Sequence, residues 1–159
     1  MGAGGTGDYP WHPKCCPNCD VFVDIEVPNR VPKFFILADA THLPFRDKVF
    51  SEVYASHVLE HLGQPAQLLR ESHRVLKSYG IVHVWVPNFT CREAYLDPTH
   101  RHVFNYLSLK SLITKSGFDT FIYSLLGNRI LPSLICKPLF YLLSGELNAK
   151  GIRREDELS

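Results

Sequence analysis

Two short apolar runs that each end in an aspartate constrain the fold of this chain more than any other feature. Val21-Phe22-Val23 ends at Asp24, and Phe34-Phe35-Ile36-Leu37-Ala38 ends at Asp39. Continuous runs of β-branched and aromatic residues are typical of strands buried on both faces of a parallel sheet. Ligands of open α/β sheets bind beyond the carboxyl ends of the strands, so the two aspartates together predict a ligand site. Either one alone fits a loop or turn cap equally well.

The middle of the chain carries the pattern strand, helix, strand. Strand patterns cover residues 49–55 and 81–86, and the second stops at Pro87, which cannot donate to a ladder. Between them Pro65 suits the first position of a helix, apolar residues follow at helical spacing, and Gly80 comes shortly after the expected end. This order predicts a parallel crossover and therefore an α/β fold.

The C-terminal third is predicted less regularly. A helix is expected to start with Ser108 as its N-cap and to end near Gly117, followed by a strand over residues 118–125. The apolar segment 134–143 predicts a helix of the core, with a lid or a dimer contact as alternatives. Residues 146–159 are predicted to be a polar, frayed tail. The expected organisation is a single domain over residues 1–145 and a tail over residues 146–159.

Charge and hydropathy give no support for several partner classes. Seventeen basic and sixteen acidic residues give a net charge of +1, so no overall basic field would attract nucleic acid or an anionic membrane. The most apolar stretch, 130–143, contains Pro132 and Pro138 and is shorter than the roughly 20 residues of a spanning helix. The first ten residues lack the pattern of a signal peptide, so we expect a cytoplasmic protein.

The N-terminal glycines match a dinucleotide-binding motif literally. Gly2, Gly4 and Gly7 satisfy G-x-G-x-x-G, and Asp24 follows Gly4 by about 20 residues, which suggests NAD and an oxidoreductase. That motif needs a preceding strand and a following helix whose N-terminus faces the pyrophosphate. Pro10, Pro13 and Pro17 prevent a regular helix there. A ligand with a ribose and an adenine but no phosphate fits better, and S-adenosylmethionine is such a ligand.

At this point the chain resembles the class I S-adenosylmethionine-dependent methyltransferases, in particular the type 11-like group. The motifs that carry the resemblance keep the order and spacing of that family from Gly2 to about Tyr123. They are the three glycines, Val23-Asp24-Ile25-Glu26, Ala38-Asp39-Ala40-Thr41-His42-Leu43-Pro44-Phe45, Ser56-His57-Val58-Leu59-Glu60-His61-Leu62, Arg74-Val75-Leu76-Lys77, Val86-Pro87-Asn88, and Asp97-Pro98-Thr99-His100 with Phe104, Ser108-Leu109 and Ser116-Gly117-Phe118.

The resemblance implies a Rossmann-like, mostly parallel sheet with helices on both faces, and S-adenosylmethionine as cofactor. It implies cofactor-binding roles for Gly2, Gly4, Gly7, Asp24, Ile25, Asp39, Ala40, Ser56 and His57. Asp24 would hold the ribose hydroxyls, Asp39 with Ala40 would contact the adenine, and Ser56-His57 would face the methionine end and the substrate. Glu60 and His61 are expected to have structural roles.

Methyl transfer from a sulfonium needs positioning and, for some nucleophiles, a base. His57, His100 and His102 are candidates, because an imidazole can accept a proton near neutral pH. His100 is preferred, since the family places its segment over the site; the alternative is that it only holds a loop. The predicted reaction is methyl transfer to an O or N nucleophile of a substrate that is a small molecule or an accessible group of a larger one.

One departure from the family affects this prediction. The family has a central strand and an acidic residue before the glycines, and this sequence starts at the glycines. Without that strand two neighbours would lack a ladder partner, which is costly for buried backbone. We therefore expect a rearrangement, pairing with another copy, or weakened cofactor binding. The alternative function is a weakly active or silent S-adenosylmethionine-binding protein that oligomerises through this edge or through the apolar C-terminal helix.

The five cysteines do not form an evident metal motif. Cys15, Cys16 and Cys19 include one C-x-x-C, and His12 could add a fourth zinc ligand, but ribbon spacing is absent. A redox pair is a further alternative. Plain loop cysteines are preferred, so no metal site is predicted.

Overall fold

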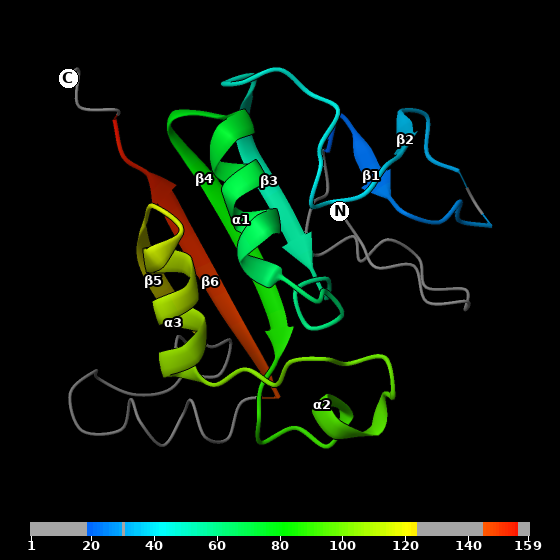
Figure 1. Ribbon diagram of the computed structural model, residues 1–159, viewed down its shortest axis with the longest axis vertical. Coiled ribbons are helices and arrows are strands. Elements are labelled where there is room, and N and C mark those ends of the chain that lie inside the picture. The colour runs from blue at the N-terminus through cyan, green and yellow to red at the C-terminus, as the bar shows by residue number, and fades with distance from the viewer. Residues whose placement is uncertain (1–18, 30, 124–144, 156–159) are drawn as a thin grey trace.

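The structure is a computed structural model that describes residues 19–29, 31–123 and 145–155. Figure 1 shows α1 and α3 in front of the larger sheet. The elements are β1 (Phe22–Asp24), β2 (Phe35–Leu37), β3 (Phe50–Ser56), α1 (Pro65–Val75), β4 (Leu76–Pro87), α2 (Glu93–Leu96), α3 (Tyr106–Lys115), β5 (Phe118–Tyr123) and β6 (Glu146–Arg153). Every strand and helix predicted within the described residues is present, with shifted bounds, and α2 and β6 are additional.

The strands form two sheets. β1 and β2 pair in parallel, and a second sheet has the order β3-β4-β6-β5. β3 and β4 are parallel and joined through α1, as predicted for a crossover, whereas β6 is antiparallel to both neighbours. Figure 1 shows β1 and β2 on the side of β3 that faces away from β4. The predicted α/β architecture is confirmed.

The prediction of a polar tail from residue 146 is wrong for residues 146–153. They form β6, which lies between β4 and β5 in the centre of the larger sheet. Small residues are required on its inward face: a Cβ at Gly151 would lie 2.9 Å from Phe118 Cβ and from Val82 Cγ1. Ala149 and Gly151 therefore pack closely without contributing the large apolar side chains by which a buried strand is usually detected. The domain extends through Arg153.

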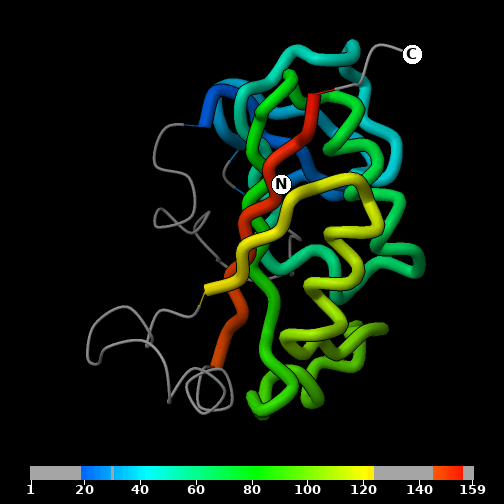
Figure 2. Tube along the Cα trace, turned by 90° about the vertical axis from the view of Figure 1, so that its left-hand side faces the viewer, coloured from blue at the N-terminus to red at the C-terminus, as the bar shows by residue number. Residues whose placement is uncertain are grey.

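The helices α1 and α3 cover one face of the larger sheet (Figure 2). α1 buries Leu68, Leu69 and Val75, and α3 buries Leu109 and Ile113, so their apolar stripes and the sheet form one core. The N-cap of α3 is Asn105 and not Ser108 as predicted. Asn105 Oδ1 accepts from the Ser108 backbone at 2.9 Å and Ser108 Oγ accepts from the Asn105 backbone at 2.9 Å, which is a capping box.

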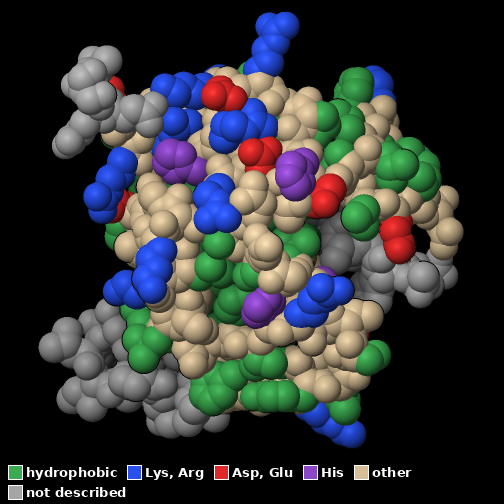
Figure 3. Space-filling view, viewed as in Figure 1, with side chains coloured by type: hydrophobic (Ala, Val, Ile, Leu, Met, Phe, Trp, Pro, Cys, Tyr) green, Lys and Arg blue, Asp and Glu red, His purple; other side chains and the backbone are tan. Residues whose placement is uncertain are grey.

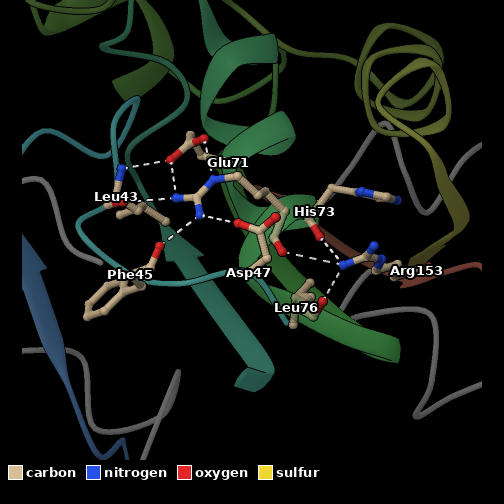
Figure 4. A network of polar contacts seen from close by, with 8 residues as sticks. Leu43, Phe45, Asp47, Glu71, His73, Leu76 and Arg153 are labelled. Atoms are coloured by element: carbon tan, nitrogen blue, oxygen red, sulfur yellow. Dashed lines mark hydrogen bonds and ion pairs between the residues drawn. The ribbon is translucent and has the colours of Figure 1, made fainter. Parts of the chain in front are cut away.

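Arginine side chains tie α1 to the segments around it (Figure 4). Arg74 donates to the carbonyls of Phe45 (2.7 Å) and Leu43 (2.9 Å) and pairs with Glu71 and Asp47. Arg153 of β6 donates to the carbonyl of His73 at 2.8 Å and to that of Leu76, at the end of α1. These contacts fix the loop between β2 and β3 and the start of β4.

Candidate functional site at the carboxyl ends of the strands

The two predicted aspartates lie at neighbouring strand ends. Asp24 is the last residue of β1 and pairs in register with Leu37, two residues before Asp39, and the Ala38 backbone donates to the Asp24 carbonyl at 2.9 Å. Asp24 is only 6% exposed, whereas Ile25 beside it is 68% exposed. Asp39 accepts from the Thr41 backbone and hydroxyl, both at 2.8 Å, and these hydrogen bonds lower the pKa of Asp39. The site therefore offers an ionised carboxylate, a buried one and an open apolar side chain.

Ser56 and His57 lie at the end of β3. Ser56 pairs in register with Trp85 of β4, and the His57 backbone donates to the Trp85 carbonyl at 3.0 Å. His57 has φ 51°, a left-handed conformation that costs energy for a residue with a Cβ. This left-handed residue directly follows the last residue of β3. The family resemblance predicts that the substrate side lies at this position.

The His57 ring lies between two carboxylates. Its Nε2 is 3.4 Å from Glu146 Oε1 and its Nδ1 is 3.3 Å from Glu60 Oε1. Contact with Glu146 and then Glu60 raises the pKa of His57 to about 10, against the effect of burial. Because both ring nitrogens face carboxylates, both carry protons at neutral pH. His57 is therefore a cation in this arrangement and has no lone pair for a substrate.

A later segment returns to the end of β3 and brings His100 with it. The backbones of Arg101 and His102 both donate to the Glu60 carbonyl, at 2.7 and 3.1 Å. The His61 and His100 rings lie edge to face with centroids 4.7 Å apart. Residues about 40 positions apart in sequence thus meet, and His100 lies beside His61 in the segment that follows β3.

The His100 ring is held from its own segment. Its Nδ1 lies 3.2 Å from the Ala94 carbonyl of α2, and its Nε2 lies 3.7 Å from Asp97 Oδ2. Since a carbonyl can only accept, Nδ1 carries the proton in the neutral ring and Nε2 carries the lone pair. His102, the other candidate base, instead packs beside Phe104 with ring centroids 6.1 Å apart.

Sequence reasoning gave no functional role to Glu60 or Glu146. Glu60 is assigned a structural role by the pattern, yet it is 1% exposed and both carboxylate oxygens lack a hydrogen-bond donor in the described structure. Glu146 lies in the segment taken for a tail. The signal that could have pointed to Glu60 is its position directly before His61 and three residues after His57, so that three ionisable groups follow one strand end.

Several other predicted features stand apart from this site. Gly2, Gly4, Gly7, Cys15, Cys16, His12 and the predicted helix at 134–143 lie outside the described residues. Cys19 is disulfide-bonded, and Cys91 is the free cysteine of the described part of the chain. Among residues 19–29, 31–123 and 145–155, no helix is long and apolar enough to cross a membrane.

The face that carries α1 and α3 has no patch of one charge. Figure 3 shows basic, acidic and histidine side chains interspersed over its upper part, while hydrophobic side chains gather along the lower edge over α2 and α3. The exposed side chains of Tyr95, Leu96 and Leu107 belong to those two helices. An apolar surface therefore adjoins the segment that carries His100.

Comparison with known proteins agrees with the motifs. Residues 23–84 match the family model described as a methyltransferase domain. Two proteins of Mycobacterium tuberculosis, from two strains and both named "Probable S-adenosylmethionine-dependent methyltransferase", are 32% identical over 97 residues, which is 58% of this chain and 35% of theirs. The chain thus spans about a third of the length of the curated relatives it matches.

Solved structures show the same fold at low identity. An S-adenosylmethionine-dependent methyltransferase from Thermotoga maritima has a TM-score of 0.61 and 16% identity, covering 83% of this chain and 72% of its own. One from Archaeoglobus fulgidus has a TM-score of 0.58 and 19% identity, covering 82% and 75%. The [4+2]-cyclase SpnF also has a TM-score of 0.58 and 19% identity, covering 90% and 69%. Because a cyclase shares the fold, the fold alone does not define the reaction.

Fold and sequence together define the class. The architecture is the Rossmann-like fold of class I methyltransferases. The segment from β1 to β4 is similar in sequence to the methyltransferase domain model and to probable S-adenosylmethionine-dependent methyltransferases, in agreement with its motifs. The matched residues include both aspartates, Ser56, His57, Glu60 and His61, whereas His100 lies beyond them.

Proposed function

We propose that this chain transfers a methyl group from S-adenosylmethionine to an oxygen or nitrogen nucleophile. The observation that carries the proposal is that Asp24, Asp39 and Ser56-His57 lie at or just after the carboxyl ends of three strands, inside the segment that matches the methyltransferase family model. Methyl transfer is an in-line displacement from a sulfonium, which leaves as a neutral thioether. The protein's own contribution is therefore positioning and removal of the acceptor's proton.

The cofactor side uses the ends of β1 and β2. The Asp24 carboxylate accepts hydrogen bonds from the ribose hydroxyls, which is favourable because ionised acceptors form stronger hydrogen bonds than neutral ones. Ile25 is exposed beside it, so packing of the adenine against its side chain removes apolar surface from water. Asp39 and Ala40, at the end of β2, contact the edge of the adenine. Ser56 and the left-handed turn at His57 face the methionine end of the cofactor.

The acceptor side uses His100. Its Nδ1 is committed to the Ala94 carbonyl at 3.2 Å, which leaves Nε2 to accept the proton of the nucleophile. His57 does not serve as the base, because both its nitrogens face carboxylates. The exposed Tyr95 and Leu96 of α2 suit an acceptor that carries an apolar part next to its nucleophile.

The cofactor half of the proposal is tested by calorimetric titration with S-adenosylmethionine and its demethylated product, with NADH as control. We expect the adenosyl ligands to bind and NADH not to bind. Asp24→Ala should weaken binding by about 1.5 to 3 kcal/mol, because it removes a charged hydrogen-bond acceptor. Asp20→Ala is the matched control, since Asp20 is an exposed carboxylate just before the same strand. Equal affinities of the two variants would remove Asp24 from the site.

The transfer half is tested by a screen of O and N nucleophiles that follows formation of the demethylated cofactor. We expect His100→Ala to lower turnover while cofactor affinity stays within twofold, because the base touches only the acceptor. A folded protein that binds the cofactor and turns over none of the acceptors would favour the alternative of a silent cofactor-binding protein. Light scattering on the same sample measures whether that protein is an oligomer.

A further inference from the structure

The most unusual polar group in the described structure is the Glu60 carboxylate. It follows β3, is 1% exposed, and neither of its oxygens accepts a hydrogen bond from the described residues. Among the described residues it makes an ion-pair contact with His57, whose Nδ1 lies 3.3 Å from Oε1, without a counted hydrogen bond. Burial of a carboxylate without donors is costly, and buried charges in proteins are normally paired and hydrogen-bonded or coordinate a metal.

Two histidines present lone pairs beside this carboxylate. Asp97 Oδ1 accepts the Thr99 hydroxyl at 2.6 Å, so the proton of that hydroxyl is already used. His61 Nδ1, 2.9 Å from the same Thr99 Oγ1, must therefore be the donor of that contact, which leaves the lone pair on Nε2. His100 Nδ1 donates to the Ala94 carbonyl at 3.2 Å, which likewise leaves the lone pair on its Nε2.

We propose that Glu60, His61 and His100 form a binding site for a divalent transition-metal cation of the Zn²⁺ type. One potential ligand atom from each residue lies within 4.8 Å of the other two. Two imidazoles and one carboxylate are the donor set of open zinc and iron sites, with further positions left for water or substrate. The hydrogen bonds from the two Nδ1 atoms are the outer contacts that orient metal-binding histidines.

The ligand atoms must approach one another slightly when the cation binds. Bonds of about 2.0 to 2.1 Å in a tetrahedral site place ligand atoms about 3.3 Å apart, against the upper limit of 4.8 Å here. His61 is only half-buried, so rotation of its side chain can supply most of that approach. Glu60 would gain a direct ligand bond for a carboxylate whose oxygens accept no hydrogen bond from the described residues.

The cation site goes beyond the proposed methyl transfer. The two proposals share one atom, His100 Nε2. The lone pair of His100 Nε2 serves either a proton or a cation. With the cation bound, an acceptor O–H at its open position would form the metal–oxygen bond and release its proton to solvent. The binding test below uses no S-adenosylmethionine, so its outcome is independent of the transfer reaction.

The test is titration of the chelator-stripped full chain with Co²⁺, followed by absorption spectroscopy. We expect one equivalent to bind, with ligand-field bands but without the sulfur-to-cobalt charge-transfer band that thiolate ligation by the N-terminal cysteines would add. His61→Ala and His100→Ala should each weaken binding at least about 100-fold, and Thr99→Val about 10-fold, because it frees the His61 ring from its orienting contact. His42→Ala, which removes an exposed histidine, should change nothing.

The outcomes separate the explanations. A thiolate band, or equal Co²⁺ affinity in the His61, His100 and His42 variants, would overturn the site. Circular dichroism shows whether each variant is folded, and Glu60→Gln provides a nearly isosteric third variant that should also lose binding. The same preparation is also titrated with S-adenosylmethionine. Binding of S-adenosylmethionine without Co²⁺ rejects the metal site and leaves the proposed function. Binding of Co²⁺ without S-adenosylmethionine rejects the proposed function and leaves the metal site.

Discussion

Two glutamates near α1 have opposite surroundings. Glu71, in the helix, has a side chain that is 15% exposed, and both its oxygens accept hydrogen bonds: from the Leu43 backbone at 2.8 Å and from the Arg74 guanidinium at 2.8 and 2.9 Å. Glu60, five residues before the helix, is more deeply buried and has no hydrogen-bond donor among the described residues. Both carboxylates lie within one short stretch of a single domain.

The difference separates a structural site from a functional one. The Arg74 cluster, formed by Leu43, Phe45, Asp47, Glu71 and Arg74, satisfies its charged groups internally and fixes a loop (Figure 4). The Glu60 cluster, formed by His57, Glu60, His61 and His100, gathers a buried carboxylate without a hydrogen-bond donor among the described residues and potential ligand atoms of two imidazoles within 4.8 Å. Buried polar groups without partners and strained backbone conformations destabilise a fold, and they persist only where the surrounding structure holds them in place. Such groups are therefore concentrated at functional sites.

The largest expected effect is on the Arg74 cluster. Arg74→Ala should lower the free energy of unfolding by about 3 kcal/mol, because it deprives two carbonyls and two carboxylates of their donor. Urea unfolding at neutral pH measures this. Arg70→Ala is the control: Arg70 is exposed on the same helix, its side chain donates only to Gln67 in the described structure, and its loss should cost less than about 0.5 kcal/mol. Equal losses of stability in the two variants would show that Arg74 stabilises the fold no more than an exposed arginine does.

An intermediate effect comes from the same substitution at both glutamates. Glu71→Gln should lower the free energy of unfolding by about 2 kcal/mol. The substitution replaces a charged hydrogen-bond acceptor by a neutral one, and the new amide N–H group faces the donors of Leu43 and Arg74. Glu60→Gln should change stability by less than about 1 kcal/mol in metal-free buffer, since the loss of its ion pair with His57 is offset by removal of a buried charge without donors. A larger loss for Glu60→Gln than for Glu71→Gln would show that the Glu60 cluster is the structural one.

The smallest expected effect is a pH dependence. Contact with Arg74 holds the pKa of Glu71 below its ordinary value of 4.5. A carboxylate with a depressed pKa stabilises the fold fully above its unfolded-state pKa, and this contribution is lost as the pH falls through the folded-state value. The difference in stability between the natural chain and Glu71→Gln should therefore be constant near neutral pH and shrink below about pH 4.5. Urea unfolding at several acidic pH values checks this, and a difference independent of pH would contradict it.

Much of the fold could be predicted because its signals are local. The apolar runs ending at Asp24 and Asp39, the proline at the start of α1 and Gly117 after α3 each indicate an element within a few residues. β6 could not be predicted in this way. Position 151 is a glycine because Phe118, Val82 and Ile113 crowd it, and those neighbours come from three other elements. Likewise the N-cap of α3 depends on which of two polar residues meets the first turn.

In the candidate site, too, some features follow from local sequence and others only from the tertiary structure. The sequence by itself determined the strand ends and their residues, because apolar runs and turn residues specify where parallel strands stop. It also supplied the family resemblance and, with it, the cofactor. Only the tertiary structure decided that Glu146 reaches His57 and that His100 lies against His61 beside the buried Glu60. Such contacts join residues tens of positions apart, and burial, which gives a carboxylate its electrostatic consequences, exists only once the chain is folded.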